Sequence, residues 1–111
     1  MKRLLAIGDS HTFGAEIFGP DDYREESKNL AYPAVLGNLL SFDEVINLGI
    51  SGASIMRTER MLVEHLSRNP KPDLVVIGWT VLGRMEYCTG VDNDGNFQYH
   101  MMNSWRSPDL D

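Results

Sequence analysis

Three short polar segments, each placed directly after an apolar run, hold the residues whose types could support catalysis. The first spans 8–14 and reads GDSHTFG, and its Ser10 follows a run that is apolar from Leu4 to Ile7. A serine between a buried strand and the start of a loop or helix can present its hydroxyl outward, with its own backbone N–H free to donate to a ligand. An ordinary polar turn would carry the same residue types, so this segment alone leaves both interpretations open.

The other two segments could supply groups that assist such a serine. Residues 47–54 read NLGISGAS, and Gly49 and Gly52 allow close backbone approach or a positive φ, with N–H groups directed into a cleft. A plain strand-to-helix turn is the commoner explanation of this spacing. A nucleotide-binding loop is not supported, because the sequence has neither GxGxxG nor a Gly-Lys-Ser/Thr ending. The third segment, 78–80, reads GWT, and a strand end with a packed tryptophan explains it equally well.

Alternating strand and helix patterns place these three segments at one edge of a sheet. Continuous apolar runs predict strands at 4–7, 44–48 and 74–77. Helical spacing predicts a helix over about 29–40, with a proline in its first turn, and a second helix from a Ser54 cap to about Arg68. The β-α-β-α-β order implies a parallel sheet with right-handed crossovers, and ligands of open α/β sheets bind at the carboxyl edge.

The remaining segments complete the expected fold. Residues 14–27 are polar and contain Gly-Pro-Asp-Asp, which predicts a loop. The second helix is expected to bury one apolar face, formed by Ile55, Met56, Leu62, Val63 and Leu66. An Asp-Gly turn within 91–97 predicts a short C-terminal hairpin. We therefore expect one α/β domain over 1–111, a flavodoxin-like three-layer α/β/α fold with a parallel sheet, incomplete at its C-terminal end.

In order and spacing, these segments resemble the sequence blocks of the SGNH/GDSL hydrolase family. The GDS of residues 8–10 matches the first block, which implies that Ser10 is the nucleophile. Residues 47–54 match the second block, which implies that Gly52 donates an oxyanion-hole N–H. The resemblance covers about residues 4–80. It implies a serine ester hydrolase that cleaves acyl or acetyl esters, for example those of sugars or lipids, without a cofactor or a metal.

Two departures from the family pattern affect the expected chemistry. At 78–80 the sequence has GWT where the family has GxND, so Thr80 occupies the position of a side-chain oxyanion donor. A threonine hydroxyl can donate one hydrogen bond, whereas losing an oxyanion donor outright costs about 2.7–4 kcal/mol of transition-state stabilisation. The late Asp-x-x-His block that supplies the family's base is missing, because no Asp in the sequence has His three residues later. A serine hydroxyl without a base is a weak nucleophile.

The three histidines of the sequence are the remaining candidates for the base. His11 is adjacent to Ser10, so we expect its side chain to diverge from the serine hydroxyl. His65 is expected at the surface or boundary of the second helix, and His100 lies in the tail, from which it could fold back. The sequence hypothesis is that the base is absent, and that the chain is an N-terminal portion or a C-terminally truncated relative of a longer hydrolase.

Two other function classes compete with the hydrolase hypothesis. A non-catalytic binding or accessory domain would keep the fold and the cleft, and both Thr80 and the missing Asp-x-x-His favour it. A flavodoxin-like phosphate or regulatory domain would place Asp9, Ser10 and Thr12 around an anion, but the acidic Asp9 makes that less attractive.

Aromatic and cationic side chains outside the three segments are candidates for the rim of a cleft. Those after the third strand suit sugars or an acyl acceptor, with ordinary packing as the alternative, and those in the first long loop are expected to help cover the cleft. The two sets are Trp79, Arg84 and Tyr87, and Phe13, Phe18 and Tyr23.

Composition excludes several classes of protein. With 42% hydrophobic residues the chain can form a packed core, and a net charge of -6 argues against a nucleic-acid surface. Cys88 is the single cysteine, so no disulfide can form within the chain. The apolar stretch before Gly8 is too short for a signal peptide, which favours the cytoplasm. The expected substrate is a small-molecule, carbohydrate or lipid ester. The exposed edge of a three-stranded sheet also predicts self-association of the chain.

Overall fold

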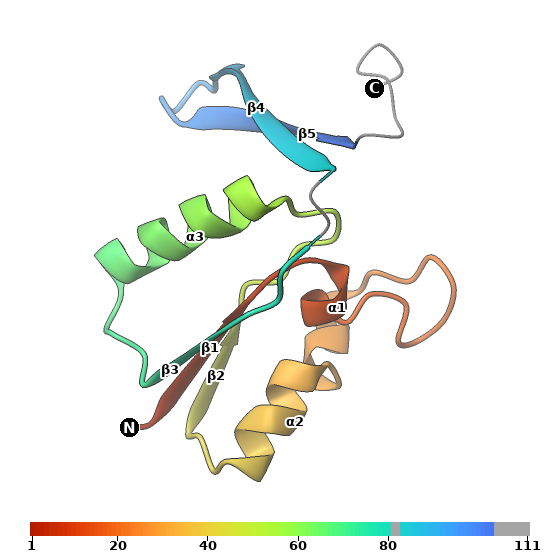
Figure 1. Ribbon diagram of the computed structural model, residues 1–111, viewed down its shortest axis with the longest axis vertical. Helices are drawn as coiled ribbons and strands as arrows, with labels where there is room; N and C mark the ends of the chain where they lie inside the picture. The colour runs from red at the N-terminus through yellow and green to blue at the C-terminus, as the bar shows by residue number, and fades with distance from the viewer. Residues whose placement is uncertain (81–82, 104–111) are drawn as a thin grey trace.

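The chain folds into a three-stranded parallel sheet with flanking helices and a separate antiparallel hairpin (Figure 1). The computed structural model describes residues 1–80 and 83–103. The elements in chain order are β1 (Arg3–Ile7), α1 (Ser10–Phe13), the 3-10 helix η1 (Glu25–Asn29), α2 (Tyr32–Leu39), β2 (Glu44–Asn47), α3 (Ile55–Arg68), β3 (Leu74–Ile77), β4 (Arg84–Val91) and β5 (Phe97–Asn103).

Strand β1 is the centre of the parallel sheet and of the core. The strand order is β2-β1-β3, with Leu4 of β1 in register with Val45 of β2 and with Leu74 of β3. All four apolar residues of β1 after Arg3 have no exposed surface, so both faces of this strand are covered. The prediction of three parallel strands in a mixed α/β domain is therefore confirmed. The carboxyl ends of the strands point toward α1, as Figure 1 shows.

Helix α2 packs on the sheet where a glycine allows close approach. Gly37 of α2 lies against Val45 of β2, and a Cβ there would collide with the Val45 side chain. The predicted start near residue 29 is wrong, because α2 begins at Tyr32 with Pro33 in its first turn. Residues 25–29 form η1 instead, so the predicted loop over 14–27 ends earlier than expected, at the start of this 3-10 turn.

Helix α3 has the predicted bounds but not the predicted apolar contacts. The Ser54 hydroxyl accepts a hydrogen bond from the backbone N–H of Arg57 at 3.0 Å, which confirms the cap. Met56, Val63 and Leu66 are 50%, 62% and 43% exposed, so the predicted buried face is wrong at these positions. Met56 and Val63 instead line an open groove between α3 and the hairpin.

The hairpin of β4 and β5 is held to α3 by a buried carboxylate. Strands β4 and β5 pair in antiparallel fashion around the Asp92–Asn96 turn, which confirms the predicted hairpin. Glu86 of β4 is 7% exposed and accepts hydrogen bonds from Arg57 at 3.0 Å and from Arg60 at 2.9 and 3.2 Å. The Arg60 guanidinium also stacks on the ring of Tyr99, 3.9 Å from its centroid. Hydrogen bonding to Glu86 raises the pKa of Arg60 above its usual range.

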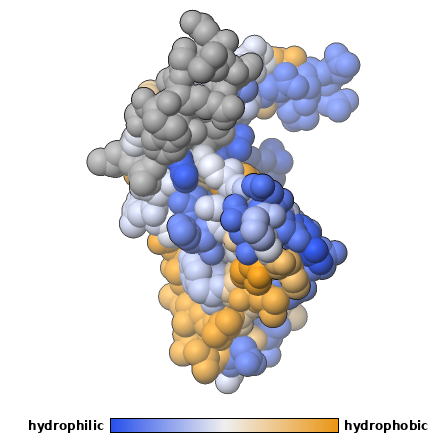
Figure 2. Space-filling view, turned by 90° about the vertical axis from the view of Figure 1, so that its right-hand side faces the viewer, coloured by the Kyte–Doolittle hydropathy of each residue, from blue (hydrophilic) through white to orange (hydrophobic). Residues whose placement is uncertain are grey.

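Apolar side chains gather on the outer surface of α2, visible as the orange region in Figure 2. Val35, Leu39 and Leu40 are 52%, 74% and 45% exposed. No element of the described residues covers them. In the part of the chain that the structure describes, no helix has the length and apolar character needed to cross a membrane.

Candidate active site

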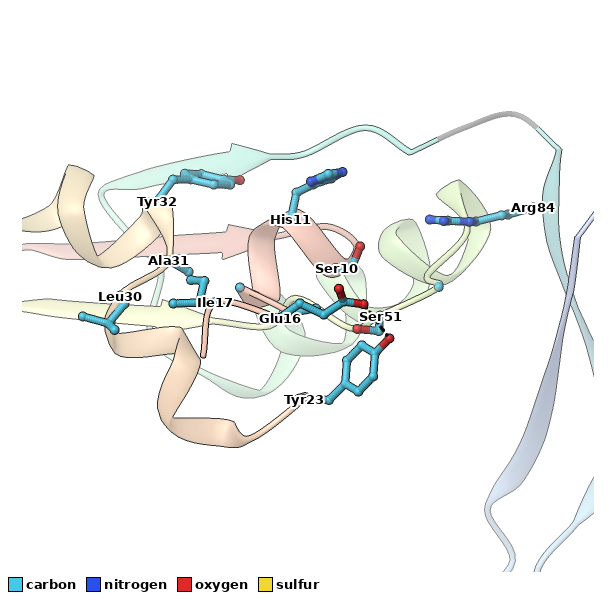
Figure 3. Close-up of a pocket in the computed structure, with 13 residues that line it drawn as sticks. Ser10, His11, Glu16, Ile17, Tyr23, Leu30, Ala31, Tyr32, Ser51 and Arg84 are labelled. Carbon is cyan, nitrogen blue, oxygen red and sulfur yellow. Dashed lines mark hydrogen bonds between the residues drawn. The ribbon is translucent and has the colours of Figure 1, made fainter. Parts of the chain in front are cut away.

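A pocket of about 610 Å³ is lined by residues of α1 and of the loop that follows β2. Ser10 and Gly52, two of the three predicted site residues, both line it, as do Ser51 and Arg84. Figure 3 shows Ser10 near the middle of the group, with Arg84 on one side and Tyr23 and Glu16 on another. The parallel sheet thus brings together two segments that are about 40 residues apart in the sequence.

Ser10 occupies the first position of α1, directly after the strand that centres the sheet. Asp9 caps this short helix, because its carboxylate accepts the backbone N–H of His11 at 3.1 Å. The helix ends at Gly14, whose φ of 88° permits the left-handed conformation at the cap. The half-buried Ser10 is therefore placed by backbone geometry at both ends of α1, with its side chain on the pocket.

Two residues that line the pocket have a backbone N–H that no described residue accepts. Within the described residues, no hydrogen bond uses the N–H of Ser10 or that of Gly52. Gly52 has a φ of 80°, a conformation that glycine adopts without the steric cost of a Cβ. The sequence resemblance implies the Gly52 N–H as an oxyanion-hole donor, and the Ser10 N–H belongs to the expected nucleophile.

The Asn47 side chain fastens the loop after β2 to α1. Its amide nitrogen donates to the Thr12 carbonyl at 2.7 Å, and its amide oxygen accepts the Gly49 N–H at 2.8 Å. Gly49 lies so close to α1 that a Cβ would come within 2.5 Å of the Phe13 nitrogen. Both polar ends of one amide are thus satisfied, which fixes the loop that carries Gly52 relative to the helix that carries Ser10.

Thr80, the third predicted site residue, does not line the pocket and reaches it through Arg84. Its hydroxyl oxygen accepts a hydrogen bond from Arg84 Nη1 at 2.6 Å. The same Nη1 donates to Asp9 Oδ2 at 3.2 Å. Since the Thr80 oxygen acts as the acceptor, its own O–H stays free to donate to another group.

The three histidines stand in different places. His11 lines the pocket and is exposed, and no hydrogen bond joins it to Ser10 among the described residues. His65 is a partly exposed residue of α3 that pairs with Asn69, as predicted for a boundary position. His100 belongs to β5, where its ring packs against Tyr87 with centroids 5.6 Å apart, rather than over the pocket.

Tyr23 and Glu16 form a second wall of the pocket. The Tyr23 hydroxyl donates to Glu16 Oε1 at 3.1 Å, the dashed line of Figure 3. This hydrogen bond to a carboxylate raises the pKa of the Tyr23 phenol above its ordinary value. Glu16 itself adopts a φ of 64°, unusual for a residue other than glycine.

The predicted rim is confirmed for two of its six residues. Arg84 and Tyr23 line the pocket, whereas Trp79 is 70% exposed outside it and Tyr87 lines a different groove between α3 and the hairpin. Phe13 and Phe18 instead lie under the cations of Lys28 and Arg24, respectively.

Sequence reasoning missed the contributions of Glu16, Ser51 and the Asp9–Arg84 ion pair. Asp9 and Arg84 are 75 residues apart, and nothing in the local pattern of either indicates the other. The position of Ser51 inside the glycine segment was a signal that could have been used. Within the described residues, no group of three or more His, Cys, Asp or Glu side chains is arranged to hold a metal ion.

A scan against protein-family models found no match to this chain, and comparisons with curated proteins and with solved structures found none either.

Proposed function

We propose that the chain is a serine ester hydrolase of the SGNH/GDSL type, with Ser10 as its nucleophile. The observation that carries the proposal is the joint placement of Ser10 and Gly52 on one pocket, each with an unused backbone N–H. A serine hydroxyl beside two such donors is what acyl transfer through a tetrahedral intermediate requires.

The reaction follows from these positions. Ser10 Oγ attacks the carbonyl carbon of the ester and forms a C–O bond while its proton passes to a base. The negative charge that develops on the carbonyl oxygen is held by the N–H groups of Ser10 and Gly52. The alcohol leaves with a proton, and water then hydrolyses the acyl-serine.

No described residue that could act as the base is hydrogen-bonded to the Ser10 hydroxyl. His11 shares the pocket, but no hydrogen bond joins it to Ser10 among the described residues. The sequence contains no Asp-x-x-His. We propose that a base beyond the described residues, or a rearranged His11, accepts the proton.

The strand order supports the finer fold proposal. The order β2-β1-β3 is that of the first three strands of flavodoxin-like sheets. With right-handed crossovers on either side of β1, this order places α2 and α3 on opposite faces. We propose the flavodoxin-like three-layer arrangement on that basis.

A binding domain that retains the hydrolase fold is the second candidate. The position of Thr80, bonded to Arg84 rather than lining the pocket, favours it. Such a domain would hold an ester or its products without cleaving them.

Covalent labelling of the purified chain distinguishes the two candidates. A fluorophosphonate is added with imidazole as an external base, and the intact mass is measured. Attack by Ser10 Oγ forms an O–P bond, releases fluoride and passes the proton to imidazole. We expect one adduct on the wild-type chain and none on Ser10→Ala.

Ser51→Ala is the matched control, because Ser51 lines the same pocket and is more exposed than Ser10. Labelling of Ser51→Ala at the wild-type level supports Ser10 as the nucleophile. Equal labelling of wild type and Ser10→Ala, or no labelling at all, overturns the hydrolase proposal in favour of the binding domain.

A further inference from the structure

Arg84 brings a cation from the hairpin into the pocket that Ser10 lines. Its side chain is 19% exposed, and it stands at the first position of β4. Figure 3 shows it reaching from β4 toward the side of the pocket where Ser10 and His11 lie. The proposed hydrolase chemistry at Ser10 does not use this guanidinium directly.

The guanidinium has more hydrogen-bond donors than its protein partners occupy. Nη1 makes both bonds, to Asp9 Oδ2 at 3.2 Å and to Thr80 Oγ1 at 2.6 Å. Nε is buried and has no acceptor within the described part of the chain. Nη2 likewise makes no hydrogen bond to a described residue. Arginine offers five N–H donors in a planar fork, so with Nη1 occupied and Nε buried the two N–H groups of Nη2 are left for another acceptor.

The other charges of the pocket leave this position open to an anion. The Glu16 carboxylate lines the pocket beside Tyr23 and accepts a hydrogen bond from the Tyr23 hydroxyl at 3.1 Å. Asp9 neutralises part of the Arg84 charge, through one oxygen at 3.2 Å. The guanidinium fork matches a carboxylate in shape and charge better than it matches a neutral carbonyl or hydroxyl.

We propose that Arg84 is a specificity-determining residue, which selects esters that carry a carboxylate close to the ester group. The inference rests on the proposed hydrolase function of Ser10 for the reaction, but the recognition of the carboxylate does not depend on catalysis. The carboxylate of such an ester would accept hydrogen bonds from the N–H groups of Arg84 that no described residue uses.

Two substrates that differ only in charge test this recognition. Monoethyl succinate carries a free carboxylate, ethyl succinamate carries a neutral amide in its place, and released ethanol is measured for both. With imidazole present, we expect wild type to favour the anionic ester in kcat/KM, mainly through KM. Arg84→Met is expected to lower that preference at least tenfold. The preference is the ratio of kcat/KM for the anionic ester to kcat/KM for the neutral ester, measured in the same variant. A change that alters the reactivity of Ser10 toward both esters therefore cancels from this ratio.

Asp9→Asn is the matched opposite change. Asparagine still caps α1, whereas the loss of the negative charge frees Arg84 for an external anion. We expect the anionic preference to rise about threefold or more in this variant. It keeps the test valid if Arg84→Met proves unstable in thermal melting.

Binding without catalysis separates the failure of this inference from that of the proposed function. Succinate is titrated into Ser10→Ala and into the double variant Ser10→Ala/Arg84→Met by isothermal calorimetry. Binding that is lost in the double variant supports the inference even where no ester is cleaved. Ester cleavage with an anionic preference that neither variant changes overturns the inference and leaves the hydrolase function standing. Succinate binding that is absent from Ser10→Ala, or equal in both variants, also overturns it.

Discussion

Removing the Glu86 carboxylate is expected to release the hairpin from α3 without unfolding the parallel sheet. The Glu86 side chain is 3% exposed, and its oxygens accept three hydrogen bonds from Arg57 and Arg60. Breaking a buried ion pair by removing one partner costs about 3–5 kcal/mol. The side chains of Arg57 and Arg60 retain 20% and 31% exposure and can turn to water, so we expect about 2–3 kcal/mol for Glu86→Ala.

Hydrogen exchange followed by mass spectrometry measures this loss locally. A cost of that size corresponds to roughly 30- to 150-fold faster exchange of the amides of β4 and β5, at 1.4 kcal/mol for each factor of ten. The amides of β1, whose residues from Leu4 to Ile7 have no exposed surface, are expected to keep their protection.

Glu64→Ala provides the comparison on the same helix. Glu64 pairs with Arg68 at 3.2 Å, with side-chain exposures of 50% and 74%, so its removal should cost less than about 0.5 kcal/mol. Exchange in the hairpin that is unchanged by Glu86→Ala would refute the reasoning. So would an equal acceleration in β1, because the hairpin would then unfold together with the sheet.

Three further outcomes are expected. Gly49→Ala places a Cβ 2.5 Å from the Phe13 nitrogen, and this overpacking should cost about 1–3 kcal/mol, measured as a lower melting temperature. Ser54→Ala removes the cap of α3 and should lower the free energy of unfolding by about 1 kcal/mol in urea titrations. The Tyr23 phenol should ionise above its ordinary pKa of 10.0 in a spectrophotometric titration, because its hydrogen bond to Glu16 favours the neutral form. The stability that this hydrogen bond contributes is fully present at pH values just below 10.0, and it is lost as the pH rises through the higher pKa of the folded state.

Each of these outcomes has its own check. Ser67→Ala changes an exposed serine of α3 away from the cap and should leave the free energy of unfolding nearly unchanged. Glu16→Gln should bring the Tyr23 pKa back toward 10.0, and a Tyr23 titration that ignores this change would contradict the assignment. A melting temperature of Gly49→Ala equal to that of wild type would mean that α1 and the loop after β2 are not in tight contact.

Local sequence patterns were enough to predict the parallel β-α-β-α-β frame and the residues that follow its strands. The run from Leu4 to Ile7 is apolar without alternation, which only a strand covered on both faces needs, and the strand is central in the sheet. Ser54 and the Asp-Gly turn are local signals, since a cap or a tight turn depends on a few neighbouring residues, and both were found where expected. Helix and strand periods are likewise local properties of the chain.

Contacts between residues far apart in the sequence could not be predicted from local patterns. The pairing of Asp9 with Arg84, and of Glu86 with Arg57 and Arg60, joins residues 75, 29 and 26 positions apart, and no local period encodes such contacts. The apolar spacing of α3 predicted burial, but burial depends on which element packs against each side chain, and β4 meets the helix through its arginines. Thr80 is a further example. Its position after β3 could be predicted from the sequence, but its hydrogen bond with Arg84 could not, because Arg84 belongs to the hairpin.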